Sequence, residues 1–115
     1  MTGIHRVNEL HNAAMDEAEY AFIARRRGNE AEARVHFEKA YDLESEAAHL
    51  TTDTSLEPTR SVLHRSAASL AYNCGKMRDA EKLIAVALAG DPPEPIAREL
   101  RELMRQVVDA LLEPA

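Results

Sequence analysis

Small and apolar side chains recur every three or four residues along most of this chain, with polar and charged residues between them. This spacing places the apolar residues on one face of an α-helix. Glycine, proline or short polar residues interrupt the pattern near residues 28, 50–57, 75 and 90–93, and such residues end helices. The pattern therefore predicts an all-α fold of about five helices. It comprises a hairpin over about 4–49, a loop over about 50–57, a second hairpin over about 58–90 and a C-terminal helix over about 94–112.

The residues at these interruptions suit the ends of helices. Gly28 and Gly75 can take a positive φ at no steric cost, which is the usual conformation just after a helix. Asn29 is predicted to cap the helix that follows it, and Pro58 stands at or near the first position of the helix after the loop. We therefore expect a tight turn at each of the two glycines.

The two predicted hairpins follow the same sequence plan. When Gly28 is aligned with Gly75, five of six aligned positions are identical, and the sixth is a large apolar residue in both hairpins. The aligned pairs are Gly28 and Gly75, Ala21 and Ala68, Ala24 and Ala71, Ala33 and Ala80, Phe37 and Ile84, and Ala40 and Ala87. The chain therefore contains an internal repeat with an offset of 47 residues.

This plan resembles the tetratricopeptide repeat, a helical hairpin with a small residue, a turn, Ala-x-x-x-Phe, a second Ala and then Pro. Its parts in this chain are Ala21, Gly28, Ala33, Phe37 and Ala40 in the first unit, and Ala68, Gly75, Ala80, Ile84, Ala87 and Pro92 in the second. The resemblance covers roughly residues 16–92, with the C-terminal helix as a cap. Glu17 and His64 stand where the family has Trp, Ser45 stands where it has Pro, and the offset exceeds the usual period of about 34 residues. The alternative is an ordinary helical bundle in which alanine-rich hairpins recur by chance.

The resemblance also implies a binding surface, because in proteins of this type the first helix of each pair lines a concave face. Alignment at the turns places seven partner-binding candidates there: Phe22, Arg25, Arg26, Arg65, Ser69, Tyr72 and Asn73. Arginine pairs with carboxylates through two parallel hydrogen bonds, so three arginines on one face of an acidic chain favour a partner with acidic groups. The alternative is that Arg25 and Arg26 only complement the dipole at the end of their helix.

Composition narrows the classes of partner and the cellular setting. The formal net charge of −6 disfavours nucleic acids and anionic membranes as partners. Cys74 is the single cysteine, and the chain has no apolar N-terminal run of the signal-peptide type, so we expect a reducing, cytoplasmic setting. For 115 residues without Trp we expect one domain, with a core of Ala, Leu, Ile and Val between closely packed helices.

No sequence motif predicts catalysis, a metal site or a cofactor. The five histidines lie outside motifs such as HExxH, Cys74 has no CxxC partner, and no GxSxG, P-loop or Rossmann glycine pattern occurs. A cluster of His64, Arg65 and Cys74 would support an enzyme. The acidic residues of the second helix are interpreted as a solvated face. These are Glu38, Asp42, Glu44 and Glu46.

We therefore predict a non-catalytic protein–protein interaction module, a small scaffold or adaptor that binds a partner peptide or protein through the concave face. Two alternatives remain: a structural homodimer built on the C-terminal helix and, with no motif in its favour, a small helical enzyme. The apolar stripe of the C-terminal helix is wider than the covering of one hairpin requires. Ile96, Leu100 and Leu103 are expected to pack on the second hairpin. Met104, Val108 and Leu111 would then stay partly exposed, or meet either a second copy or the first helix around Ile4, Val7 and Leu10.

Overall fold

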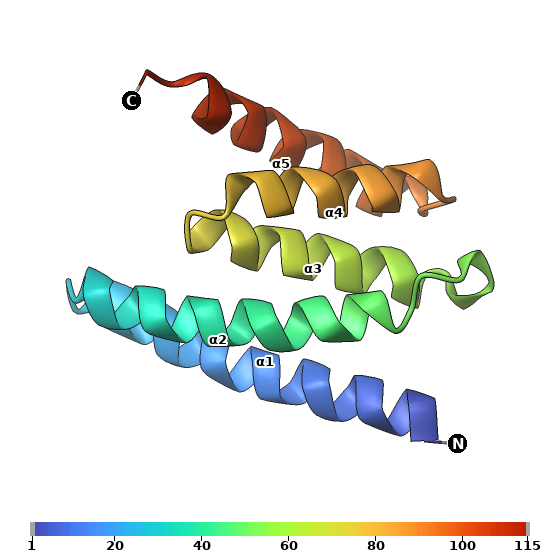
Figure 1. Ribbon diagram of the computed structural model, residues 1–115, viewed down its shortest axis with the longest axis horizontal. Coiled ribbons are helices and arrows are strands. Elements are labelled where there is room, and N and C mark those ends of the chain that lie inside the picture. The colour runs from blue at the N-terminus through green and yellow to red at the C-terminus, as the bar shows by residue number, and fades with distance from the viewer. Residues whose placement is uncertain (1, 115) are drawn as a thin grey trace.

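The computed structural model describes residues 2–114, and over this range the chain forms five α-helices, one 3-10 helix and no strand (Figure 1). The α-helices are α1 (Thr2–Arg26), α2 (Glu30–His49), α3 (Thr59–Asn73), α4 (Met77–Ala89) and α5 (Glu94–Leu112). The 3-10 helix η1 (Thr54–Leu56) lies in the loop before α3. The all-α prediction is therefore confirmed, and the predicted hairpins and C-terminal helix correspond to α1–α2, α3–α4 and α5.

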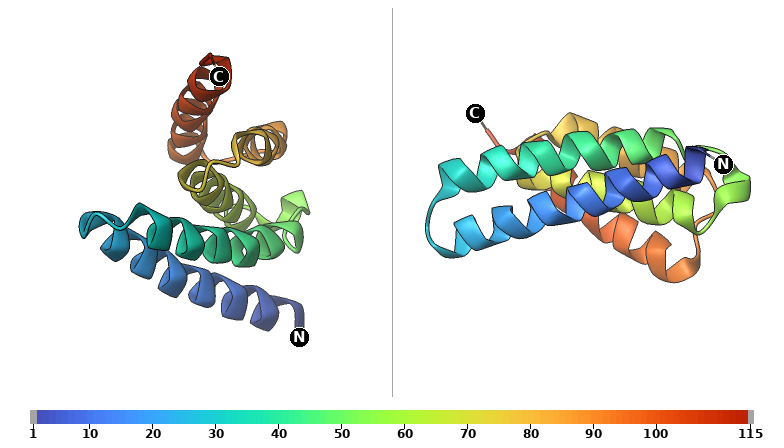
Figure 2. Two further views of the ribbon diagram at one scale, coloured as in Figure 1. Left: turned by 60° about the vertical axis from the view of Figure 1, so that its left-hand side comes forward. Right: turned by 90° about the horizontal axis from the view of Figure 1, so that it is seen from below.

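The helices are stacked in the order of the sequence. α1 packs on α2, α2 on α3, α3 on α4 and α4 on α5, and α5 also contacts α3. Figure 1 shows α1 at one end of the stack and α5 at the other, and the left-hand view in Figure 2 also keeps these two helices apart. Each helix thus covers the apolar face of its neighbours, while the two end helices each keep one open side.

The two tight turns have the same backbone geometry. Gly28 and Gly75 have φ angles of +80° and +81°, so the predicted positive φ is confirmed at both. The backbone N–H of the residue after each glycine donates to a carbonyl five residues earlier, at 2.9 Å in the first turn and 2.8 Å in the second. This bond satisfies a carbonyl that the end of the helix leaves without an intrahelical partner. Asn29 also caps α2 as predicted, because its side chain accepts a hydrogen bond from the N–H of Glu32 at 3.1 Å.

The core is built largely from alanine, whose short side chain lets neighbouring helices approach closely. Ala33 of α2 and Ala80 of α4, aligned in the repeat, are both fully buried. Phe37 and Ile84, also aligned, are the two largest fully buried side chains of the described residues, and each belongs to a different core cluster. Tyr41 packs against both clusters. One continuous apolar layer therefore runs through both hairpins.

A buried arginine fixes the loop before α3 to the end of α4. Only 5% of Arg60 is exposed, and its Nε donates to the Thr52 carbonyl at 2.8 Å while Nη2 donates to the Val86 carbonyl at 2.8 Å. A cation at this place satisfies carbonyls at the C-terminus of α4 and complements the dipole of that helix. Gly90 lies so close that an added Cβ would overlap the Arg60 guanidinium. The loop that the sequence indicates only as polar is therefore held by a side chain from α3.

The first half of α1 does not meet α5. Within the stack α1 packs on α2 and not on α5. Val7 and Leu10 are buried, whereas Ile4 is 64% exposed. The sequence offered contact between the ends of α1 and α5 as one option, and the position of these helices at opposite ends of the stack does not provide it.

The stripe of α5 divides as predicted only in part, because Met104 packs against the same core cluster as Leu103. Ile96, Leu100 and Leu103 lie in the cluster that contains Leu83, Ile84 and Leu88 of α4. Farther along α5, Met104 and Val108 are partly buried, and 36% of Leu111 is exposed. The exposed fraction of Leu112 rises to 77%. The C-terminal end of α5 therefore presents apolar side chains to solvent.

The predicted solvated face of α2 is wrong at one residue. Glu44 is fully buried, whereas Asp42 and Glu46 of the same helix are exposed. The Nδ1 atom of His11, on α1, lies 2.8 Å and 3.0 Å from the two carboxylate oxygens of Glu44. A buried carboxylate is costly unless a partner compensates it, and the imidazole from the neighbouring helix supplies that partner.

Candidate functional site

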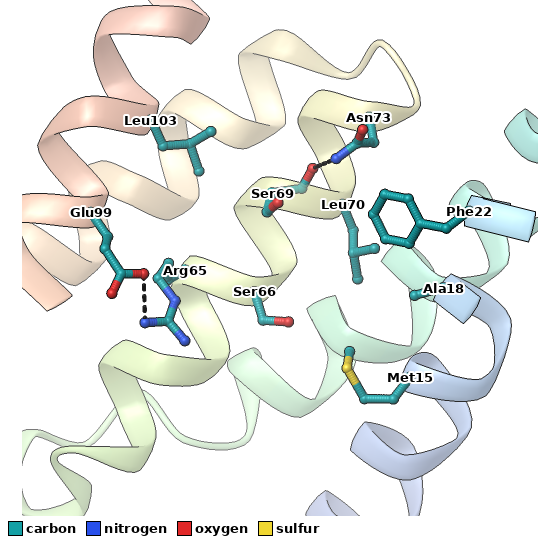
Figure 3. A pocket seen from close by; sticks show the side chains of 10 residues that line it. All are labelled: Met15, Ala18, Phe22, Arg65, Ser66, Ser69, Leu70, Asn73, Glu99 and Leu103. Atoms are coloured by element: carbon teal, nitrogen blue, oxygen red, sulfur yellow. Dashed lines mark hydrogen bonds and ion pairs between the residues drawn. The ribbon is translucent and has the colours of Figure 1, made fainter. Parts of the chain in front are cut away.

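One hollow draws its lining from three helices that are far apart in the sequence (Figure 3). We call it the α1–α3–α5 hollow; its volume is about 370 Å³. It is lined by Met15, Ala18 and Phe22 of α1, by Arg65, Ser66, Ser69, Leu70 and Asn73 of α3, and by Glu99 and Leu103 of α5. Figure 3 shows α3 along the middle of the hollow, with α1 on one side and α5 on the other.

The hollow brings together some of the predicted partner-binding residues and not others. Those that line it are Phe22, Arg65, Ser69 and Asn73. Arg25 lies at its border, since it donates to Asn73, but Arg26 is exposed elsewhere and Tyr72 packs against the core. Successive residues of an α-helix point about 100° apart, so Arg26 and Tyr72 cannot face the same way as Arg25 and Asn73.

The guanidinium of Arg25, on α1, is held in place by contacts with two other helices, α2 and α3. Its Nη1 donates to the Asn73 side-chain oxygen at 2.7 Å, and its Nη2 donates to the Asn73 backbone carbonyl at 3.3 Å. Its Nε pairs with Glu30 at 3.0 Å, and the guanidinium carbon lies 4.6 Å from the centroid of the Phe37 ring. Asn73 in turn donates to the Ser69 carbonyl at 2.8 Å. Arg25 therefore joins the ends of α1 and α3 and fixes one end of the hollow.

A carboxylate from α5 offsets the charge of Arg65. The Nη1 atom of Arg65 lies 2.9 Å from Oε2 of Glu99, across the hollow from α3 to α5. The side chain of Arg65 is 29% exposed and that of Glu99 is 58% exposed. The guanidinium is thus the better anchored member of the pair, and the carboxylate is the member that solvent or another anion can replace.

The α1 side of the hollow is apolar. Phe22 is 44% exposed and makes an edge-to-face contact with the buried Phe37, with ring centroids 5.0 Å apart. Met15 and Ala18 continue this wall along α1, and Leu103 faces it from α5. A large apolar side chain from another molecule can be covered here, while Arg65 and the serine hydroxyls offer polar contacts to its backbone or neighbours.

Sequence reasoning missed the residues that α5 contributes. Glu99 and Leu103 are four residues apart and share one helix face, yet α5 was interpreted as a cap for the second hairpin or a dimer surface, and not as a wall of the binding face. Ser66 was missed as well, although it lies three residues before Ser69 on the same face of α3. The helical periodicity shows that these residues share a face with each other, but it does not predict which face of each helix lines the hollow.

The cluster that would have supported an enzyme is not formed. Arg65 lines the α1–α3–α5 hollow, His64 is 2% exposed and lines a different hollow beside α2 and α4, and Cys74 is buried near Phe37. Burial raises the pKa of the Cys74 thiol, which disfavours a thiolate. Burial also lowers the pKa of His64, whose Nδ1 lies 2.6 Å from the Arg60 carbonyl. The three side chains therefore have separate structural environments.

Comparisons with protein-family models, with curated proteins and with solved structures found no match to this chain. Between residues 2 and 114, no group of three or more His, Cys, Asp or Glu side chains is arranged to hold a metal ion. No helix in this part of the chain combines the length and apolar character needed to cross a bilayer. Function is therefore inferred from the residues that line the hollows and from their contacts.

Proposed function

We propose that this chain is a non-catalytic protein–protein interaction module, and that a segment of a partner protein binds in the α1–α3–α5 hollow. The observation that carries the proposal is the convergence of three helices on one hollow with an exposed aromatic wall. Phe22 has nearly half of its surface open although its neighbour Phe37 is fully buried. Exposed aromatic side chains beside anchored arginines are typical of surfaces that bind other proteins.

The resemblance to the tetratricopeptide repeat supports the same surface. In that family the first helices of successive hairpins line the binding face, and here α1 and α3 are those helices. The matching turns at Gly28 and Gly75 agree with a repeat of this type. We propose a scaffold or adaptor role in a reducing, cytoplasmic setting, for which a single, buried cysteine is suited.

The partner segment that fits best combines a large apolar side chain with a carboxylate. The apolar group would rest against Phe22 and Met15, and the carboxylate would pair with Arg65 in place of Glu99. Glu99 would then act as an internal competitor, because the partner must displace it before Arg65 is free. An exposed ion pair contributes only about 0.2–1 kcal/mol, so this displacement is a small cost to binding.

A matched pair of variants tests the proposal. Ser69→Arg places a long side chain in the hollow, whereas Val35→Arg makes an equal change of charge on the exposed outer surface of α2, where Val35 is 52% exposed. Each variant and the wild type would be used to capture partners from the native source, after circular dichroism has shown that all three fold. We expect the same proteins on the wild type and on Val35→Arg, and their loss on Ser69→Arg.

The chemistry of the partner is tested with a captured protein or a peptide from it. Arg65→Gln should weaken its binding by about tenfold or more, the effect of removing an anchoring arginine. Glu99→Gln should tighten binding by about two- to fivefold, and Glu102→Gln, the same change of charge on α5 outside the hollow, should not. Partners that bind Ser69→Arg and the wild type equally would refute the proposed site, and weaker binding to Glu99→Gln would refute the competitor role.

A further inference from the structure

A second hollow lies on the side of α3 that faces α2 and α4. Its volume is about 170 Å³, below the roughly 300–1,000 Å³ of sites for drug-sized ligands. The two hollows lie on different sides of α3. Arg65 lines the α1–α3–α5 hollow, and its neighbour in the sequence, His64, lines this one. We call it the polar hollow; its lining is Tyr41, His49, Thr52, His64, Asp79, Lys82, Leu83 and Val86.

Two histidines of this lining are fixed in the same way. The Nδ1 of His64 lies 2.6 Å from the Arg60 carbonyl, and the Nδ1 of His49 lies 2.7 Å from the Ser45 carbonyl. A carbonyl can only accept, so each Nδ1 carries the hydrogen. In a neutral ring the other nitrogen, Nε2, is then an acceptor, and burial lowers the pKa of His64, which favours the neutral ring. His64 thus keeps a fixed acceptor at a place where its side chain is almost wholly buried.

The Nε2 atom of His64 has no hydrogen-bond partner among the described residues. Between residues 2 and 114, no side-chain nitrogen or oxygen is both buried and without a hydrogen-bond partner. Within residues 2–114 the His64 ring makes its hydrogen bond through Nδ1, so we infer that Nε2 keeps some contact with solvent in the hollow that His64 lines. A ligand donor placed there would form a hydrogen bond that the protein itself leaves unmade.

Charges of opposite sign flank this acceptor. Asp79 and Lys82 stand three residues apart on α4, a spacing at which opposite charges can pair, and Arg78 and Glu81 on the same helix do so at 3.3 Å. Among the described residues no ion pair of 4.0 Å or less joins Asp79 to Lys82, although both line the polar hollow. The half-buried Asp79 and the exposed Lys82 thus give the polar hollow an anion and a cation that are not directly paired. Leu83 and Val86 supply apolar wall beside them.

We propose that the polar hollow binds a small zwitterion, a free α-amino acid. Its ammonium group would donate to the Asp79 carboxylate and to Nε2 of His64, and its carboxylate would accept from Lys82. Its side chain would rest against Leu83 and Val86, so a short apolar side chain fits best. A ligand with both charges uses both flanking groups and leaves the net charge of the site unchanged.

The proposal is tested by titration calorimetry with the proteinogenic amino acids, after a thermal-shift screen of the same set. Propylamine and propionate, which each carry one of the two charges, are the comparison ligands. We expect at least one amino acid to raise the melting temperature and to bind at one site, and both comparison ligands to bind about tenfold more weakly or worse. On binding, the Nε2 signal of His64 should shift in a nitrogen–proton correlation spectrum, because that atom gains a donor.

Variants locate the site and separate binding from folding. Asp79→Asn and Lys82→Gln should each weaken binding by about tenfold or more. Asp42→Asn and Lys39→Gln make the same changes of charge at exposed positions of α2 and should leave binding unchanged. The proposal is overturned if no amino acid shifts the melting temperature, if propylamine or propionate binds as tightly as the amino acid, or if Asp79→Asn binds as the wild type does.

Discussion

The buried pair of His11 and Glu44 gives the sharpest test of what holds the first hairpin together. Glu44 has no exposed surface, His11 is 36% exposed, and their closest approach is 2.8 Å. Removing the imidazole leaves a buried carboxylate without its partner, which costs about 1–3 kcal/mol for an unsatisfied group and up to about 3–5 kcal/mol for a broken buried pair. Because the site is partly open to water next to His11, we expect His11→Leu to lower the free energy of unfolding by about 2 kcal/mol.

Substituting the other partner, Glu44, should lower the free energy of unfolding much less. In Glu44→Leu the carboxylate is gone, and His11 can turn its polar atoms to solvent. Replacing both partners by apolar groups is nearly neutral in comparable cases, so the double variant should be about as stable as Glu44→Leu and more stable than His11→Leu. This asymmetry distinguishes the desolvation of one carboxylate from the loss of a favourable contact, which would affect both single variants alike.

Urea unfolding followed by far-ultraviolet circular dichroism measures these differences, since the chain has no Trp for fluorescence. His5→Leu is the control, because His5 pairs with Glu9 on the surface, where the side chains are 80% and 57% exposed. Such a pair contributes about 0–1 kcal/mol. The reasoning fails if His11→Leu is no more destabilising than His5→Leu, or if the two single changes at the buried pair are equal and additive.

Three further predictions concern turns, pH and assembly. Gly75→Ala should lower the free energy of unfolding by about 1 kcal/mol or more, because φ is +81° and Arg34 would crowd the new Cβ at 3.2 Å; urea titration should show no such loss for Gly3→Ala, inside α1. Since burial lowers the pKa of His64 below 6.5, the unfolded chain takes up a proton first, so stability falls as pH drops through about 6.5; unfolding curves over this range should depend less on pH in His64→Gln. If the exposed end of α5 joins two copies, sedimentation should show a dimer that Leu112→Glu dissociates; a wild-type monomer at micromolar concentration would end that alternative.

The local features of the fold could be predicted from the sequence because they depend on neighbouring residues. Gly28 and Gly75 end their helices through backbone freedom that only glycine has, and Asn29 caps α2 with its own side chain. Small residues at the same distances from Gly28 and from Gly75 then indicated two hairpins with the same sequence plan. None of these inferences needed knowledge of what lies across the molecule.

The environment of charged residues could not be predicted in this way. Glu44 was grouped with its exposed neighbours because helical periodicity separates apolar from polar faces, and a buried acid falls outside that rule. Its partner is 33 residues away, and Glu99, which neutralises Arg65, is 34 residues away. Such pairs depend on how the helices are stacked, so the sequence predicted Arg65 in the α1–α3–α5 hollow but not the carboxylate that faces it.

The stacking of helices in sequence order has a consequence for how the ends of the molecule behave. In such an array each helix depends mainly on its neighbours, so either end can open without the other. The α1–α3–α5 hollow is an exception, since its walls come from both end helices. A partner segment bound there would contact both end helices, so neither end could open until the segment dissociates. The affinity for the partner would thus depend on the stability of the whole stack. A substitution that destabilises α1 far from the hollow would weaken partner binding although the substituted residue does not contact the partner.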